Sequence, residues 1–333
     1  MPPNQVPQPL ISVALSVYNG ERHLREQLDS VLAQKEVQLE IIAVDDGSSD
    51  GSVALLREYA KRDPRIHVHV NPHNLGHLRS FERVMSLCGG EFIAPCDQDD
   101  IWHPQKLARL ADAIGDADLA YCDSEYIDEQ GQSLRRRISQ DLSMHAGIDP
   151  LRYVFQNTVS GHACLLRRKL LQRAGPAPAL LYHDWWLAMC AAAHAGVVYV
   201  DAPLVQFRRH VSAFSPLGKK REAKARLSKK ERRARVSGCA NRKWIAERLY
   251  VARMLGETDW RGSAAARDWF AALQLAIAGN TGPLLQVTWR DRMSVPPWNG
   301  RPWISAVKFY RRCKRKIRHS RREPEPSTPL FRA

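Results

Sequence analysis

The 333-residue chain has no apolar run close to the ~18 residues that a helix needs to cross a bilayer. Its first residues, MPPNQVPQPL, lack a basic segment followed by an apolar one, so the sequence predicts neither a secretory signal nor a transmembrane span. The seven cysteines include no CxxC pair, and we expect reduced thiols rather than a disulfide framework or a zinc site. Neither GxxxxGKS nor GxGxxG follows the first apolar segment, which argues against P-loop hydrolases and dinucleotide oxidoreductases.

Charge is distributed unevenly along the chain, whose net charge is +15. Residues 208–333 carry 31 Lys and Arg against 9 Asp and Glu, whereas residues 1–207 carry 19 against 26. A hydrophobic content of 44% is enough for a large buried core. We therefore expect one large folded domain in the acidic first part, and a basic last part with a different role.

Short apolar segments alternate with amphipathic ones through the first half of the chain. The predicted strands are ISVALSVYN, LEIIAVDDG, IHVHVN and EFIAPCD, and the predicted helices cover about residues 21–34, 52–61 and 78–88. This order predicts an α/β fold with a Rossmann-like, mostly parallel sheet and helices on both faces. Continuous apolar strands are typical of a sheet that is covered on both faces.

Polar residues follow each predicted strand, and in open sheets of this kind ligands bind beyond the carboxyl ends of the strands. The segments at these ends are 17–20 (VYNG), 45–47 (DDG), 71–76 (NPHNLG) and 97–100 (DQDD). Asp and Asn also cap helices and form turns, so each segment alone has a structural explanation. Because the four segments are predicted along one edge, we interpret them together as a binding site.

Asp97 and Asp99 are two positions apart at the end of a strand. In an extended segment both carboxylates would point to the same side, where they could share a Mg²⁺ or Mn²⁺ ion that bridges diphosphate oxygens. The alternative is an Asp-rich turn before the helix that begins near His103, with Asp100 as its cap.

These segments, in this order and spacing, resemble the family 2 glycosyltransferases with a GT-A fold over about residues 10–215. The matching segments are LSVYNGERHLREQLDSVLAQ, VDDGSSDGS, NLG, CDQDDIWHPQKL, HDWW and FRRH. DQDDIW together with HDWW is most similar to the rhamnosyltransferase-type subgroup that builds O-antigen and related cell-surface polysaccharides. One departure is Ser80, which stands where many relatives place an asparagine.

The resemblance implies a role for each matching residue. Asp46 would accept a hydrogen bond from the nucleobase imide with Asp45 or Ser48 supporting the loop, although either aspartate can face the base. Asp99 and His210 would hold the metal, whereas a lone histidine such as His210 can also be an ordinary surface or core residue. The other donor-binding residues would be Val17, Tyr18 and Asn19 at the base and ribose, Gly76 at the diphosphate loop, Asp97 near the ribose and Arg208 beside the phosphates.

Asp184 falls where the family keeps its catalytic base. A carboxylate there would take the proton from the acceptor hydroxyl as the hydroxyl oxygen attacks the anomeric carbon, and the configuration would be inverted. The metal would neutralise charge on the departing diphosphate. The alternative is that Asp184 caps the helix that begins at this position. Trp185 and Trp186 would be packing residues, or one of them would stack on a sugar.

Two basic runs, residues 218–235 and 308–322, lie in the last third of the chain together with six tryptophans. Such runs are often solvated helix faces or disordered tails. Trp beside Lys and Arg is typical of helices at a membrane surface, so we favour an anionic membrane over nucleic acid as the partner. The expected location is cytoplasmic and peripheral, at the inner face of the plasma membrane, where a polyprenyl-diphosphate-linked acceptor is found.

The sequence thus predicts a flexible N-terminus over residues 1–9, a GT-A domain over 10–215, a basic and mainly helical region over 216–322, and a disordered tail over 323–333. The predicted activity is an inverting, Mg²⁺- or Mn²⁺-dependent transfer of a sugar, with rhamnose favoured, from a dTDP- or UDP-linked donor to a saccharide or lipid-linked acceptor. Two alternatives stay open, namely a nucleotidyltransferase and a non-catalytic protein that binds a nucleotide sugar or a polyanion.

Overall fold

The computed structural model describes residues 8–209, 239–296 and 301–320, which form two compact units. The first unit consists of residues 8–148 and 158–209, and the second of residues 149–157 and the described residues from 239 onward. Residues 149–157 were predicted within the first domain, but they pack with the second unit. Residues 1–7, the basic run over 218–235, His210 and the tail over 323–333 lie outside the described residues.

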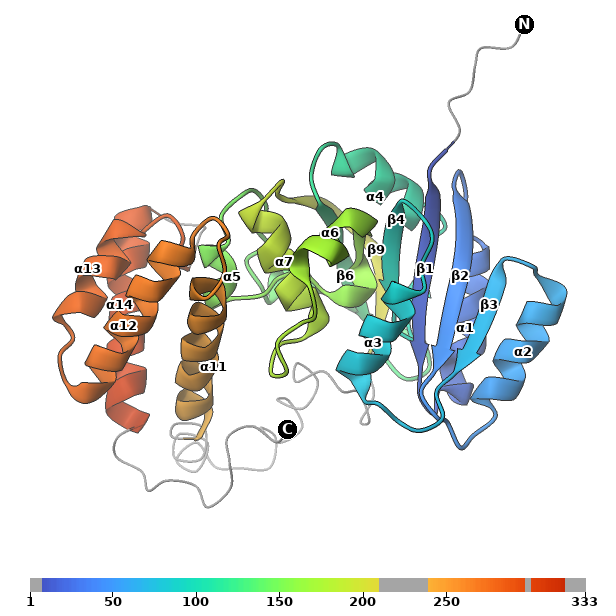
Figure 1. The fold of residues 1–333 in the computed structure, drawn as a ribbon, viewed down its shortest axis with the longest axis horizontal. Coiled ribbons are helices and arrows are strands. Elements are labelled where there is room, and N and C mark those ends of the chain that lie inside the picture. Colours follow the sequence, from blue (N-terminus) through green and yellow to red (C-terminus); the bar gives the residue numbers. More distant parts are fainter. Residues whose placement is uncertain (1–7, 210–238, 297–300, 321–333) are drawn as a thin grey trace, which may run out of the picture. The chain divides into compact units, whose positions relative to one another are not determined.

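A nine-stranded sheet runs through the first unit (Figure 1). Its strands are β1 (Leu10–Val17), β2 (Gln38–Asp45), β3 (Ile66–Val70), β4 (Phe92–Cys96), β5 (Ile101–Trp102), β6 (Leu119–Ile127), β7 (Ser133–Arg137), β8 (Cys164–Arg167) and β9 (Val197–Arg208). The strand order is β3-β2-β1-β4-β8-β6-β9-β5, with β7 paired to β6. The four strands predicted from the alternating pattern occupy one half of this sheet.

Most neighbouring long strands are parallel, as predicted, and β8 is the main exception. The pairs β1–β2, β1–β4, β2–β3 and β6–β9 are parallel. β8 is antiparallel to both of its neighbours, β4 and β6. The beginning of β8 therefore lies toward the end of β4, where Cys164 pairs with Tyr121 of β6.

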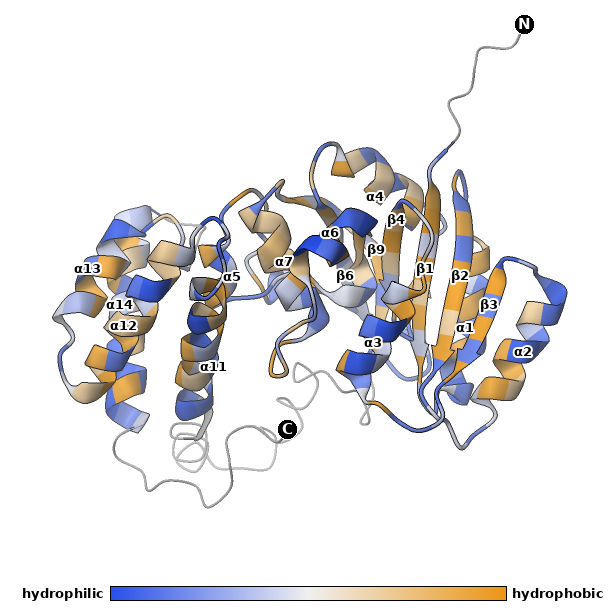
Figure 2. Cartoon of the chain, in the orientation of Figure 1, coloured by the Kyte–Doolittle hydropathy of each residue, from blue (hydrophilic) through white to orange (hydrophobic). Residues whose placement is uncertain are grey.

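Helices cover both faces of the sheet, as predicted. They are α1 (Glu21–Leu32), α2 (Ser52–Arg62), α3 (His77–Ser86), α4 (Lys106–Ile114), α6 (Arg168–Ala174) and α7 (His183–Ala193), with the short 3₁₀ helices η1 (Ile138–Gln140) and η2 (Gly161–Ala163). Alternate residues of β1, among them Val13 and Leu15, pack in one core cluster with side chains of α1, α2 and α4. On the opposite face, Ser16 shares a 2.9 Å hydrogen bond with Ser80 of α3. Figure 2 shows the apolar character of β1 and β2.

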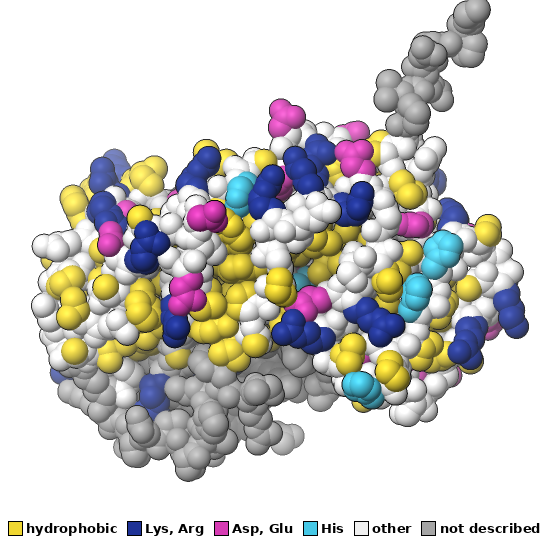
Figure 3. Space-filling model, in the orientation of Figure 1, with side chains coloured by type: hydrophobic (Ala, Val, Ile, Leu, Met, Phe, Trp, Pro, Cys, Tyr) yellow, Lys and Arg dark blue, Asp and Glu magenta, His cyan; other side chains and the backbone are white. Residues whose placement is uncertain are grey.

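The second unit is helical, as predicted for the basic region. Its helices are α5 (Leu151–Phe155), α11 (Cys239–Gly256), α12 (Ser263–Ala278), α13 (Gly282–Arg290) and α14 (Pro302–Ser320). The rings of Phe155, Trp269 and Phe309 pack edge to face, with centroids 4.7 to 6.1 Å apart. Figure 3 shows hydrophobic side chains at the surface of this unit beside Lys and Arg. None of the helices in the described ranges is both long and apolar enough to span a bilayer.

Candidate active site

Hydrogen bonds join the loops that follow β1, β2 and β4. Gln98 accepts the backbone N–H of Tyr18 at 2.7 Å and donates to the Tyr18 carbonyl at 3.1 Å. Asn19 donates its backbone N–H to Ser48 at 2.9 Å, and its side-chain oxygen accepts the N–H of Ser49 at 2.9 Å. The segments predicted at these strand ends are therefore linked to one another by hydrogen bonds. Asn19 contributes by holding the loop after β2.

The other two residues predicted at the base pocket differ in exposure. Val17 is fully buried and packs in the core cluster between the sheet and its helices. Tyr18 is 48% exposed, so its ring is open to a ligand. Of these two side chains, only that of Tyr18 is exposed.

Asp46 is buried and holds the loop that follows β3. One of its carboxylate oxygens accepts the Asn71 side-chain amide at 2.6 Å and the Leu75 N–H at 2.9 Å, and the other accepts the Gly76 N–H at 3.0 Å. Gly76 has a φ of 83°, which favours glycine at this turn. Both carboxylate oxygens of Asp46 thus have hydrogen-bond partners within the protein.

Asp45 has a different environment, although it is also fully buried. Its Oδ1 accepts the Ser48 N–H at 2.8 Å, while its Oδ2 has no hydrogen-bond partner. A buried polar atom without a partner costs about 1–3 kcal/mol, so this oxygen is suited to a donor group of a ligand. Of the two aspartates that the sequence could not separate, only Asp45 has a carboxylate oxygen without a hydrogen-bond partner within the protein.

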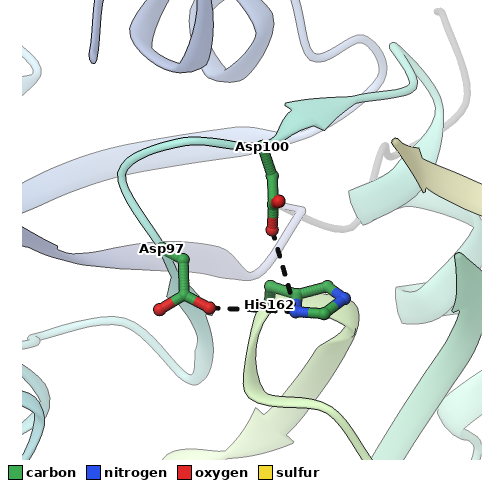
Figure 4. Close-up of side chains that lie close together, drawn as sticks. All are labelled: Asp97, Asp100 and His162. Atoms are coloured by element: carbon green, nitrogen blue, oxygen red, sulfur yellow. Dashed lines mark ion pairs between the residues drawn. The ribbon is translucent and has the colours of Figure 1, made fainter. Parts of the chain in front are cut away.

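Asp97, Asp100 and His162 form a compact cluster at the end of β4 (Figure 4). His162 Nδ1 lies 3.8 Å from a carboxylate oxygen of Asp97 and 3.7 Å from one of Asp100. The predicted pair was Asp97 with Asp99, which required an extended segment. The chain instead bends at Gln98 and Asp99, and the fourth residue of DQDD, Asp100, joins Asp97 in the cluster.

This cluster fits a divalent cation. One ligand atom from each of its three side chains lies within 4.8 Å of the other two, and Oδ2 of the fully buried Asp100 has no hydrogen-bond partner. Two carboxylates with one imidazole form a donor set that suits Mn²⁺ and, less well, Mg²⁺. Burial, together with the charges of Asp99 and Asp97, raises the pKa of Asp100 to about 7.

His162 compensates the negative charge of the cluster. Its burial alone would lower the pKa of the imidazole, but the carboxylates of Asp100 and Asp97 outweigh this effect and raise that pKa. The ring stacks on Phe207 with centroids 4.5 Å apart, and Nε2 shares a 3.1 Å hydrogen bond with Ser124. The sequence patterns did not predict His162, because the predicted site residues follow strands and His162 precedes β8.

Asp184 lies in the first turn of α7, beside the acidic cluster. The capping position is Tyr182, so the predicted alternative of an Asp184 cap is wrong. Its carboxylate accepts the N–H groups of Gly161 at 3.2 Å and Trp185 at 2.6 Å. Burial raises the pKa of Asp184 to about 6, with a further contribution from Asp97. A carboxylate with this pKa is ionised at neutral pH and is suited to act as a general base.

Aromatic contacts fix the first turn of α7. The ring of His183 stacks on Phe81 of α3 with centroids 4.3 Å apart, and burial lowers the pKa of His183 to about 3. A Cβ at Gly161 would lie 2.8 Å from His183 Nε2, so the glycine is required for this packing. Trp186 is buried and donates to the Ala174 carbonyl at 3.0 Å, which makes it a packing residue.

Arg208 is not placed as predicted. Its side chain is 1% exposed and donates to acceptors within the protein, so in this structure it is not open to a diphosphate. The other residue predicted from the FRRH segment, His210, lies outside the described residues.

Residues 12–175 match the sequence model of the family Glycosyl transferase family 2. Over 216 residues the chain is 31% identical to EpsH of Bacillus subtilis, a protein named as a glycosyltransferase, and the alignment covers 62% of each chain. Over 119 residues it is 32% identical to TuaG of the same organism, named as a teichuronic acid biosynthesis glycosyltransferase, with 36% of this chain and 47% of TuaG covered. The chain thus spans less than two thirds of the length of these two relatives.

A solved structure shares the fold. The crystal structure of S. aureus TarS residues 1–349 in complex with UDP-GlcNAc matches 93% of this chain and 89% of that chain, with a TM-score of 0.57 and 16% sequence identity. At this identity the likeness concerns the fold alone, a GT-A-like α/β sheet followed by a helical region. Together, the family match over residues 12–175 and the relatives above identify a glycosyltransferase family 2 domain in this chain.

Proposed function

We propose that the chain transfers a sugar from a nucleoside-diphosphate donor to a hydroxyl group of a saccharide acceptor, with inversion at the anomeric carbon. The observation that carries this proposal is the position of Asp184, whose carboxylate is held by the Gly161 N–H next to His162 of the acidic cluster. A base for the acceptor and a site for the leaving diphosphate are thereby adjacent. The match to the glycosyltransferase family supports the same chemistry.

Each part of the site then has one role. Asp45 accepts a hydrogen bond from the base of the donor, and Tyr18 forms the wall of the base pocket. Asp97, Asp100 and His162 would hold Mg²⁺ or Mn²⁺, which supplies positive charge near the diphosphate when it is bound. Asp184 takes the proton of the acceptor hydroxyl as the new C–O bond forms and the bond from the anomeric carbon to the phosphate oxygen breaks.

The proposed donor is a dTDP- or UDP-linked sugar, with rhamnose as the leading candidate. The combination of DQDDIW and HDWW in this sequence supports rhamnose. The proposed product is a cell-surface polysaccharide such as an O-antigen or capsule, and its acceptor is a saccharide, free or linked to polyprenyl diphosphate. The name of TuaG, which refers to teichuronic acid biosynthesis, supports this class of product.

A panel of nucleotide sugars tests the proposal. The wild-type protein with Mn²⁺ should consume one of them and release the nucleoside diphosphate, and Asp184→Asn should not. Proton NMR of the product should show an inverted anomeric configuration. A rise in melting temperature with UDP or dTDP and Mn²⁺ but no sugar consumption would favour a binding protein. Release of pyrophosphate from a nucleoside triphosphate and a sugar phosphate would favour a nucleotidyltransferase.

We further propose that the second unit associates with the anionic inner surface of the plasma membrane. Six exposed basic residues lie on α14, which has no Asp or Glu: Lys308, Arg311, Arg312, Lys314, Arg315 and Arg318. Leu285, Trp289 and Met293 are all exposed and spaced four residues apart, and Trp289 is 50% exposed. Exposed Trp and basic side chains together are suited to a lipid headgroup region.

A further inference from the structure

Arg208, the last residue of β9, connects several separate segments of the first unit. Its Nε donates to the Asp99 carbonyl at 2.8 Å, and its Nη1 donates to the carbonyls of Asp128 at 3.4 Å and Glu129 at 3.1 Å. Its Nη2 donates to the carboxylate of Glu26 in α1. Four of the five N–H groups of the guanidinium are thus matched by acceptors within the protein.

The backbone of Arg208 holds the same acidic loop. Its N–H donates to Asp100 Oδ1 at 3.0 Å, and the other oxygen of that carboxylate lies 3.7 Å from His162 Nδ1. The chain enters β5 directly after Asp100, and in this strand Ile101 pairs with Gln206 of β9. One residue therefore fixes the Asp99 carbonyl with its side chain and the Asp100 carboxylate with its backbone.

We infer that Arg208 is a positioning residue for the cation site formed by Asp97, Asp100 and His162, and that it does not bind the phosphates of the donor. The inference rests on the proposed function, because the cation belongs to that proposal. A guanidinium that reached a phosphate would have to leave the Asp99 carbonyl and the Glu26 carboxylate. Lysine cannot replace it, since a single ammonium group does not reproduce the planar set of donors.

The test is the affinity of the protein for Mn²⁺ alone, measured without donor by electron paramagnetic resonance or calorimetry. We expect Arg208→Lys to weaken Mn²⁺ binding by about 10-fold, the lower end of the loss seen when groups that orient metal ligands are changed. The matched control is Arg167→Lys. Arg167 likewise donates to backbone carbonyls, those of Ala117 and Gly115, but it lies at the opposite end of β8 from His162, and its replacement should leave Mn²⁺ affinity unchanged.

A second variant keeps the test decisive if Arg208→Lys does not fold. Glu26 is 57% exposed, so Glu26→Gln removes the charge paired with Arg208 without opening the core. Glu26→Gln should also weaken Mn²⁺ binding, but by a smaller factor than Arg208→Lys. Mn²⁺ affinity equal to that of the wild type in Glu26→Gln and in any folded Arg208 variant would overturn the inference.

A measurement of nucleotide binding distinguishes a positioning role of Arg208 from a contact between Arg208 and the phosphates. Without metal, the preference for UDP over UMP, or for dTDP over dTMP, should be the same in Arg208→Lys and in the wild type. Loss of this preference with normal Mn²⁺ affinity would make Arg208 a phosphate ligand and overturn the inference. A wild-type protein that binds no Mn²⁺ would instead contradict the cation site of the proposed function.

Discussion

Asp45 and Asp46 are adjacent at the end of β2, yet only Asp46 has both carboxylate oxygens bonded within the protein. We expect Asp45→Asn to weaken UDP or dTDP binding by about 10- to 100-fold, the equivalent of one hydrogen bond to a charged group, with little change in melting temperature. Asp46→Asn should instead lower the melting temperature, because it weakens the bonds to Asn71 and Gly76. Calorimetry measures nucleotide binding and thermal unfolding measures stability. If Asp46→Asn weakened nucleotide binding and Asp45→Asn only lowered the melting temperature, the base contact would be assigned to Asp46.

Transfer by the protein should depend on pH through Asp184. The carboxylate acts as a base only when ionised, and its pKa is about 6, so kcat should fall about tenfold per pH unit below that value and level off above it. Asp184→Asn should lower kcat by about 100- to 10,000-fold while leaving UDP or dTDP binding intact. Asp116→Asn, which changes an exposed carboxylate, is the control. A kcat that stays constant from pH 5 to 8 in the wild type would exclude Asp184 as the base.

The structure and the sequence motif make different predictions for Mn²⁺ binding. If Asp97, Asp100 and His162 hold the ion, Asp100→Asn and His162→Ala should each weaken binding at least tenfold, and Asp99→Asn should have a smaller effect. Protons compete with the metal for Asp100, whose pKa is about 7, so the affinity of the wild type should decrease as the pH falls below 7. If Asp99→Asn abolished Mn²⁺ binding and Asp100→Asn left it normal, Asp99 would be the metal ligand, as the sequence motif predicts.

Membrane association of the second unit should be electrostatic. The protein should bind vesicles that contain phosphatidylglycerol, and high salt should release it. Replacing Arg311, Lys314 and Arg318 by Gln should weaken binding by about 100-fold, since each basic residue near an anionic surface contributes about 1 kcal/mol. The matched control changes three exposed basic residues of the first unit, Lys35, Arg57 and Lys61, to Gln. Equal binding to neutral phosphatidylcholine vesicles would contradict the proposal.

Local patterns predicted the first half of the fold well. The helix expected over 21–34 is α1 (Glu21–Leu32), and the strand expected at EFIAPCD contains β4 (Phe92–Cys96). Apolar periodicity is a property of neighbouring residues, so it can be read without knowing the rest of the chain. The motifs likewise placed Asp97 directly after a strand and Asp184 at the start of a helix, as the structure has them.

The choice of ligand atoms could not be predicted from the same patterns. Asp100 lies close to Asp97 in a loop that bends at Gln98, where Gln98 bonds to Tyr18, a contact across 80 residues. His162 was not predicted because β8 runs antiparallel to β4, so the residue of the cluster comes before its strand. In each case a segment that is distant in the sequence determines which side chain faces the site. The spacing of residues along the chain does not reveal such a contact.

Gly161 and His183 occupy a space that cannot hold two side chains. A Cβ at position 161 would lie 2.8 Å from the His183 ring, which is itself stacked on Phe81 and cannot swing aside. During divergence from a common ancestor, an alanine at 161 is therefore tolerated only in a lineage that has already replaced the imidazole at 183 with a smaller group. The two positions are expected to change together, and in that order.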